Sequence, residues 1–392
     1  MDRPADLGPE AVLAVADGAR PELTGDLLAR LAGSRQRTLA ALGGGGPVYG
    51  VTTGLGSQAG VTVGGVAGSG FQGDLMLARS VGTAPWLDRR SVRAATATRL
   101  RTLLEEEVGA SPELVVALAA LLGSELRPAV PASGYGAAGE IIPLAHLGGF
   151  LAGTGDGLDA TGSTVAAGTL LRRAGLSTYE FGAKEGVSFL QGVPVATAEA
   201  ILLGADCRVL TAQCLATAAA GTVAVRATRD PYDDALARGD VELSRVLAVL
   251  RSLAGPEPRP RMLQSPVSYR VVGPALAHLL RRVQQLAESV GRALAGVTTS
   301  PALLGGRFRG TAGFDGFDLA AGADAVRVAL LHLAELATAR LHRLLDPRVT
   351  GLPPQLSADP GRQAGVVALH KRAVGLVHEA RREAAPVALG AA

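Results

Sequence analysis

The sequence is poor in several residue types, and each shortage excludes a class of protein. Aromatic residues make up 3% of the 392 residues, so alanine, leucine and valine must fill the interior, and such small side chains favour closely packed helices. There are two cysteines, Cys207 and Cys214, which excludes a disulfide framework and fits a reducing compartment. The net charge is only +3, without a basic tail or an aromatic-basic stripe, so we expect no nucleic-acid partner.

The sequence also has little that would direct it to a membrane. Its N-terminus, Met1-Asp2-Arg3-Pro4, lacks the apolar core of a signal peptide. The best candidate for a membrane span, Val209–Val225, is uncharged but slightly short, and it contains Ala, Thr, Gln and Gly as much as Val and Leu. We interpret this segment as a central helix buried on all sides in a bundle. The sequence therefore predicts a soluble, cytoplasmic protein without a membrane partner.

Apolar residues recur at three- and four-residue spacing along several long segments, which is the periodicity of helices. These segments are Pro112–Ser124, Thr197–Thr228, Pro274–Leu294 and Ala323–Leu345. Strand-like alternation is short and rare. The 52 glycines concentrate in connections, which we interpret as loops that shape a site on a helical scaffold. No internal repeat or Pro/Ser-rich linker divides the chain, so residues 1–392 are predicted to form one all-α domain.

One segment carries a recognisable signature. Residues 134–147 read Gly-Tyr-Gly-Ala-Ala-Gly-Glu-Ile-Ile-Pro-Leu-Ala-His-Leu. This resembles the signature of the histidine, phenylalanine and tyrosine ammonia-lyases and aminomutases, Gly-Ala-Ser-Gly-Asp followed by Leu-x-Pro-Leu-Ala-His. In that family the Ala-Ser-Gly tripeptide cyclises and dehydrates into methylidene-imidazolone, the electrophile that activates the substrate. Here Ala137-Ala138-Gly139 takes its place, and Ala138 has no hydroxyl to eliminate, so the methylidene group cannot form.

The resemblance extends over roughly residues 45–355. Residues 49–56, Tyr-Gly-Val-Thr-Thr-Gly-Leu-Gly, are similar to the family's Tyr-Gly-Val-Asn-Thr-Gly-Phe-Gly loop. Further segments match family motifs in the family's order: Phe71–Arg79, Lys184–Gly192, Gln264–Arg270, Gly305–Gly310 and Gly351–Pro353. The resemblance implies a bundle of long, roughly aligned helices that assembles as a homotetramer, in which each pocket borrows loops from neighbouring subunits.

The resemblance also implies which residues form the site. Tyr49 stands where the family has its catalytic base, in a loop with Thr53 and Gly54, and Arg270 stands where an arginine holds the substrate carboxylate. Cationic neighbours would help a tyrosine to act as an acid or base. The alternative interpretation is that Tyr49 is a structural loop residue.

The departures from the family pattern fall where the chemistry would be. Glu140 replaces the aspartate beside the tripeptide and is a second catalytic candidate, or the partner of an arginine. Gln191 replaces an asparagine that helps to polarise the prosthetic group. Arg79 replaces a pocket-lining histidine, and Arg307 replaces an asparagine. We predict that Arg79, Arg307 and Gln191 bind substrate together with Arg270, Thr53 and Gly54, although Arg79 and Arg307 could instead be surface residues or partners of acids.

Other signals are weak. The glycine-rich runs do not follow a strand in a βαβ unit, which argues against a dinucleotide site. His370 and His378 lie near one helical face without a carboxylate at metal spacing, so we expect no metal. Lys184-Glu185 is interpreted as a helix start, with a Schiff-base lysine as the minority alternative. Relative to the family, the sequence stops before a further active-site glutamate and the long terminal helices, so the bundle is expected to be shortened at its C-terminus.

These observations favour an enzyme with the ammonia-lyase fold that works without methylidene-imidazolone and without another cofactor. Its expected chemistry is acid-base elimination, isomerisation or cyclisation of an anionic small molecule that its own carbonyl or conjugation already activates, in specialised metabolism. Two alternatives stay open. The chain could be a non-catalytic binding or scaffold homologue, or a residual aromatic amino acid ammonia-lyase. Matching a fold does not transfer its chemistry.

Overall fold

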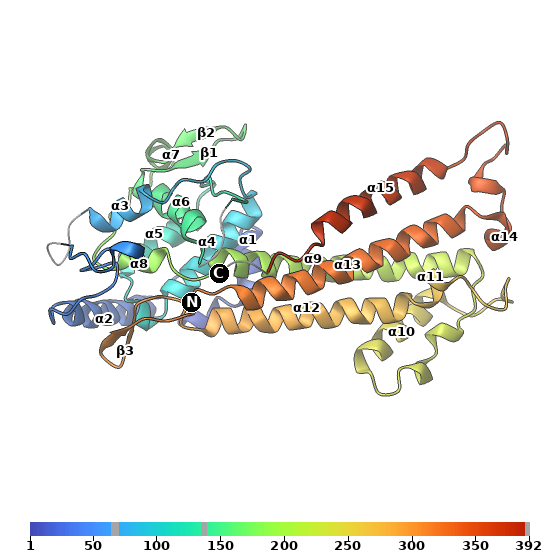
Figure 1. The fold of residues 1–392 in the computed structure, drawn as a ribbon, viewed down its shortest axis with the longest axis horizontal. Helices are drawn as coiled ribbons and strands as arrows, with labels where there is room; N and C mark the ends of the chain where they lie inside the picture. Colours follow the sequence, from blue (N-terminus) through green and yellow to red (C-terminus); the bar gives the residue numbers. More distant parts are fainter. Residues whose placement is uncertain (64–69, 135–138, 389–392) are drawn as a thin grey trace. The chain divides into compact units, whose positions relative to one another are not determined.

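The computed structural model describes residues 1–63, 70–134 and 139–388 and is mostly helical, as the apolar periodicity predicts (Figure 1). The chain divides into two compact units. Among the described residues, unit 1 comprises those within 1–202 and 289–319, and unit 2 comprises those within 203–288 and 320–388. That all 392 residues form one domain stays a prediction.

Unit 1 is built around one buried helix. The residues of α4 (Arg89–Leu103) are buried from Ser91 to Leu103, and α4 packs against α1, α5 and α8. Unit 1 contains the helices α1 (Pro9–Ala16), α2 (Gly25–Leu42), α3 (Phe71–Leu77), α4, α5 (Pro112–Leu122), α6 (Ile141–Ala152), α7 (Ala167–Arg173) and α8 (Glu185–Phe189), together with the start of α9 (Pro194–Ala224), the end of α12 (Val272–Ala295) and the first residues of α13 (Phe317–Leu344). Short 3-10 helices lie at Pro4–Asp6, Gly56–Gln58 and Glu106–Val108.

Helix boundaries in unit 1 follow local chemistry. The hydroxyl of Ser111 accepts a hydrogen bond from the Leu114 amide at 3.2 Å, Pro112 occupies the first turn of α5, and the helix ends before Gly123. These are the residue types that begin and end helices. The expected helix Pro112–Ser124 is therefore confirmed to within two residues.

Two small antiparallel hairpins are the strands that the structure shows in unit 1. In the first, β1 (Asp156–Leu158) pairs with β2 (Thr164–Ala166), and in the second, β3 (Ala302–Leu304) pairs with β4 (Arg307–Arg309). The second hairpin turns at Gly305-Gly306, whose φ angles of 59° and 75° need glycine. Two of the glycine-rich connections thus form or flank hairpins.

Unit 2 contains most of the residues of three long helices: α9, α12 (Val272–Ala295) and α13 (Phe317–Leu344). Its remaining elements are α10 (Val241–Ala254), α11 (Val267–Arg270), α14 (Pro347–Thr350), α15 (Val367–Glu383) and 3-10 turns at Asp230–Tyr232, Asp234–Leu236 and Pro354–Leu356. Part of its core is a cluster of Val225, Ala227, Tyr269 and Val349. The expected helices at Pro274–Leu294 and Ala323–Leu345 are confirmed as α12 and α13.

The helix expected at Thr197–Thr228 differs at its end. α9 stops at Ala224, before Thr228 at the end of the expected range, because Arg226 adopts a left-handed backbone with φ 51°. By length and composition alone, residues 185–224 could cross a membrane, but 78% of the most apolar window is buried inside the protein, as in a core helix. We expected this helix to be buried on all sides. In the single chain this expectation is wrong, since Val209 is 61% exposed and Val223 is 45% exposed.

Candidate functional site

The predicted site residues of unit 1 are organised around the five-residue helix α8. Every residue of α8 is buried. The helix begins after Lys184, whose φ of 69° turns the chain into it, which confirms that Lys184-Glu185 is a helix start. Because α8 is only five residues long, groups that contact its two ends lie within about 8 Å along its axis.

The loop that carries Tyr49 is tied into a compact turn. The Tyr49 hydroxyl accepts a hydrogen bond from the Gly56 amide at 2.9 Å, and the Gly54 amide donates to the Val61 carbonyl at 2.9 Å. Thr53 is buried, and its hydroxyl donates to the Gly54 carbonyl at 3.1 Å. Tyr49 itself is 39% exposed, so its ring stays accessible while its loop is fixed.

A buried glutamine connects this loop to α8. The side-chain amide of Gln72, on α3, donates to the Gly50 carbonyl at 2.9 Å, and its carbonyl oxygen accepts from the Val187 amide at 3.0 Å. At Gly50, with φ 67°, an added Cβ would meet the Val187 side chain at 2.8 Å, so the loop needs glycine to approach α8 this closely. Sequence reasoning placed Gln72 only within a similar segment and missed this positioning role.

The other end of α8 leads to Gln191. Residues 190–193 connect α8 to α9, and three of these four residues are buried while Gln191 is half-buried. Gly139, the described residue of the predicted tripeptide position, lies beside this turn: an added Cβ there would be 3.9 Å from the Gly192 carbonyl oxygen. Ala137 and Ala138 lie outside the described residues.

Glu140 is 6% exposed and contacts the first turn of α9. Its two carboxylate oxygens accept hydrogen bonds from the Val195 amide at 2.5 Å and the Ala196 amide at 2.6 Å. Burial raises the pKa of Glu140 to about 7, while these amides and Arg99 act in the opposite direction. The arginine whose charge acts on it is thus Arg99, which sequence reasoning did not single out. The catalytic role of Glu140 stays a prediction.

Arg99, on α4, is completely buried. Its Nη1 donates to the carbonyls of Phe189, at 3.3 Å, and of Gln191, while its Nε and Nη2 have no hydrogen-bond partner among the described residues. Burial lowers the pKa of Arg99 to about 9, and the charge of Glu140 opposes this shift. The sequence offers no signal that identifies Arg99, because only the burial of residues 91–103 in the structure distinguishes it from a solvated arginine.

The three predicted substrate-binding arginines are distributed over different elements. Arg79 follows α3, which packs against α8, and it is half-buried with Nη1 3.4 Å from the Leu75 carbonyl. Arg307 is exposed on β4; its neighbour Phe308 has its ring centroid 6.0 Å from the Lys184 Nζ. Arg270 ends α11 in unit 2, where its buried Nε has no hydrogen-bond partner among the described residues.

Lys184 combines complete burial with two hydrogen bonds. Its Nζ donates to the Val108 carbonyl and to the Ser188 hydroxyl, each at 2.8 Å. Burial lowers the pKa of Lys184 to about 7, and the charge of Arg35 adds to the shift. A Schiff base needs a carbonyl compound to reach the amine, and this Nζ is enclosed. The contacts support a structural role at the start of α8.

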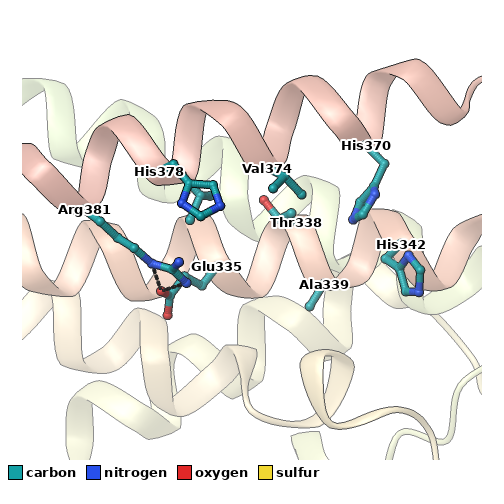
Figure 2. A pocket seen from close by; sticks show the side chains of 9 residues that line it. Glu335, Thr338, Ala339, His342, His370, Val374, His378 and Arg381 are labelled. Atoms are coloured by element: carbon teal, nitrogen blue, oxygen red, sulfur yellow. Dashed lines mark hydrogen bonds and ion pairs between the residues drawn. The ribbon is translucent and has the colours of Figure 1, made fainter.

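Unit 2 contains a separate pocket of about 430 Å³ between α13 and α15 (Figure 2). The rings of His342 and His370 lie near each other at one end of the pocket, with their centroids 4.8 Å apart. At the other end Arg381 donates from Nε and Nη2 to one oxygen of Glu335, at 3.0 and 2.8 Å. The expectation of His370 and His378 on one face is confirmed, since both line this pocket. No group of three or more possible metal ligands occurs in the part of the chain that the structure describes.

Comparison with known proteins places this architecture in a family. A sequence model of the family described as "aromatic amino acid lyase" matches residues 7–391. The chain therefore belongs to the aromatic amino acid lyase family.

Named relatives agree with this assignment. Histidine ammonia-lyase of Streptomyces avermitilis is 31% identical over 391 residues, covering 96% of this chain and 76% of the relative. Histidine ammonia-lyase of Rhodospirillum rubrum is 29% identical, covering 92% and 73%. Among solved structures, tyrosine aminomutase from Streptomyces globisporus superposes with a TM-score of 0.89 at 25% identity, covering 96% of this chain and 77% of that one. The ergothionase of Treponema denticola, at 21% identity and a TM-score of 0.88, shares the fold.

Proposed function

We propose that this chain is a lyase- or isomerase-type enzyme that works without methylidene-imidazolone. The observation that carries the proposal is Ala138, at the position of the serine that cyclises in the family. Residues 137–139 do not fit the prosthetic group, because neither alanine offers a side-chain oxygen whose loss would create the double bond. Membership of a family of lyases and aminomutases supports an enzymatic role.

The residues that persist support acid-base chemistry on an anionic substrate. In the proposal Tyr49 transfers the proton, and its loop supports this role because the hydroxyl is held by the Gly56 amide while the ring stays accessible. Arg270 anchors the anionic group. Its buried Nε–H has no hydrogen-bond partner among the described residues and can donate to the substrate. Gln191, Arg79 and Arg307 complete the binding surface.

The proposed substrate is already activated by its own carbonyl or conjugation. The β-proton of a free aromatic amino acid is barely acidic and needs the external electrophile, so ordinary histidine or phenylalanine deamination is not the proposed reaction. Elimination, isomerisation and cyclisation all fit a substrate with an acidified C–H bond. We place the activity in the cytoplasm, in specialised metabolism.

We further propose a homotetramer. Unit 2 leaves large apolar side chains exposed on α9 and α13, among them Val209, Val223 and Val328, each more than 40% exposed. Surfaces of this kind favour association, and a neighbouring subunit is the partner that the family resemblance implies. In such an assembly Arg270 of one subunit can serve a pocket that contains Tyr49 of another. Multi-angle light scattering checks the mass, and a monomer at micromolar concentration would contradict both statements.

The test of the function has two parts. Intact mass should equal that of the unmodified sequence, and loss of two waters within residues 137–139 would overturn the proposal. A substrate is then identified by incubating the protein with pools of conjugated carboxylates and following their conversion. On that substrate Tyr49→Phe should impair turnover far more than binding. Arg270→Ala should weaken binding about ten- to hundredfold, as expected for a lost charge-assisted contact. Full activity of Tyr49→Phe would remove its acid-base role.

A further inference from the structure

We propose that Arg99 and Glu140 are positioning residues that together present the Gln191 side chain to the ligand pocket. The pair holds the turn between α8 and α9 from both of its ends. This inference rests on the proposed function in one respect, namely that Gln191 lines the pocket. The structural part, the fixation of the turn, stands on contacts within unit 1.

Arg99 holds the beginning of the turn. Its Nη1 donates to the carbonyl of Phe189, the last residue of α8, and to the carbonyl of Gln191 in the turn that follows. The carbonyls at a helix end lack partners within the helix and carry partial negative charge, so a guanidinium group is the donor that suits them. The Cζ of Arg99 also lies 6.0 Å from the centroid of the Phe189 ring, which keeps the guanidinium over α8.

Glu140 holds the end of the turn. Its carboxylate accepts from the amides of Val195 and Ala196, in the first turn of α9, where free N–H groups and the positive end of the helix dipole favour an anion. Glu140 also directly follows Gly139, so the same residue connects the predicted tripeptide position to α9. Both carboxylate oxygens of Glu140 already accept hydrogen bonds from backbone amides. These contacts support a positioning role for Glu140 better than a role in proton transfer.

The two charges depend on each other. Both side chains are almost completely buried, and a buried charge is tolerated when an opposite charge compensates it. The electrostatic influence of each on the other is attractive, since Glu140 stabilises the charged form of Arg99 and Arg99 stabilises that of Glu140. The pair thus joins α4, α6, α8 and α9 at one point.

The turn between the two clamps presents one side chain. Leu190, Gly192 and Val193 are buried, and Gln191 is the half-buried member of the four. Gly192 has φ 89°, and an added Cβ there would lie 3.1 Å from the Thr298 side chain, so the turn is also enclosed on that side. Because its neighbours are buried and its carbonyl accepts from Arg99, the backbone of Gln191 is fixed, while its half-buried side chain stays partly accessible.

Arg93 supplies the matched control. It is on the same helix, is 6% exposed, and donates to three backbone carbonyls at 2.8–2.9 Å, those of Val15, Leu122 and Ala19. Arg93→Ala therefore removes a buried arginine of the same kind from α4 without touching the turn at 190–193.

The experiment is amide hydrogen exchange on the full-length chain, read by mass spectrometry. In Arg99→Ala we expect residues 189–196 to exchange about ten- to hundredfold faster, the factor for loss of charge-assisted hydrogen bonds. Methylguanidinium at millimolar concentration should occupy the space left by the side chain and restore protection there. In Arg93→Ala residues 189–196 should exchange as in the parent chain, with or without methylguanidinium.

Unchanged exchange at 189–196 in Arg99→Ala, or the same increase in Arg93→Ala, would overturn the clamp. Should Arg99→Ala fail to fold, Arg99→Lys replaces it: a lysine can keep one carbonyl contact, so intermediate exchange supports the clamp and unchanged exchange overturns it. Gln191→Ala separates the two proposals. If it leaves turnover of the identified substrate unchanged while the exchange results hold, then Gln191 does not serve the pocket and the fixation of the turn still stands.

Discussion

The two units use their charged residues in different ways. In unit 1 charged side chains are buried and bonded to backbone groups, as with Arg93, Arg99, Glu140 and Lys184. In unit 2 Arg340 is the one buried arginine, lysine or acid among the described residues, and exposed ion pairs occur in both units, such as Arg37 with Glu106 in unit 1 and Arg381 with Glu335 in unit 2. A buried charge fixes the backbone that it touches, whereas an exposed pair is screened and mobile. The unit that carries Tyr49 and Gln191 is therefore also the unit in which most of the buried charges hold backbone groups in place.

The difference between a buried and an exposed glutamate gives the largest expected effect. Glu140→Ala leaves two backbone amides without their buried acceptor and removes an opposite charge that acts on Arg99, so it should lower the free energy of unfolding by about 3–5 kcal/mol. Glu335→Ala breaks a surface pair and should cost at most about 1 kcal/mol. Urea denaturation of both variants measures the difference. If both variants lost the same free energy of unfolding, the buried glutamate of unit 1 would stabilise the protein no more than the exposed glutamate of unit 2.

Lys184 is a buried charged residue of unit 1 whose contribution to the free energy of unfolding should depend on pH. Burial lowers its pKa from 10.5 in the unfolded chain to about 7 in the folded one. Between these values the unfolded chain binds more protons, so the contribution of Lys184 to stability rises with pH, by at most roughly 1.4 kcal/mol per pH unit. Below pH 7 both states are protonated and the contribution is constant and least favourable.

The measurement is urea denaturation of the parent chain and of Lys184→Met at pH 7.5, 8.5 and 9.5. The stability of the parent should rise relative to that of the variant across this range, since the variant lacks the titrating group. Other groups that titrate cancel in the comparison. Parallel curves would mean that the buried amine keeps its ordinary proton affinity. Lys371, which is exposed on α15, provides the control Lys371→Met, for which we expect no such divergence.

Much of the fold could be predicted from the sequence, because long helices carry their periodicity and caps locally. Pro112 and Gly123 bracket α5 in the sequence as they do in the structure. The end of α9 could not be predicted, since it depends on the left-handed backbone of Arg226, whose carbonyl accepts from the Arg261 amide. A contact between residues so far apart in the chain leaves no periodic signal.

The site was predictable only where a motif supplied it. Resemblance located Tyr49, Gln191 and Glu140, and the structure adds that α8 connects their surroundings. Arg99 was missed because an arginine in a helix usually marks the solvated face, and only the burial of residues 91–103 shows otherwise. The proposed relation of Arg270 to Tyr49 requires a neighbouring subunit, which neither periodicity nor motif encodes.

Two helical glycines give the smallest expected effects on the free energy of unfolding. Replacing the glycine of unit 1 should destabilise the protein, and replacing the glycine of unit 2 should stabilise it. At Gly186 of α8 an added Cβ would lie 2.4 Å from the Gln72 carbonyl oxygen, a backbone atom that cannot move without shifting α3. Gly186→Ala should therefore cost about 1–3 kcal/mol and weaken the Gln72 contact that holds the Tyr49 loop.

At Gly375 of α15 nothing lies within 4 Å of an added Cβ. Gly375→Ala should stabilise the chain by about 0.4–1 kcal/mol, because alanine reduces the freedom of the unfolded helix segment. Thermal and urea denaturation compare the two variants, and amide exchange at residues 49–56 should rise in Gly186→Ala alone. A stabilising Gly186→Ala would mean that α3 and α8 are not held together closely enough to fix the loop.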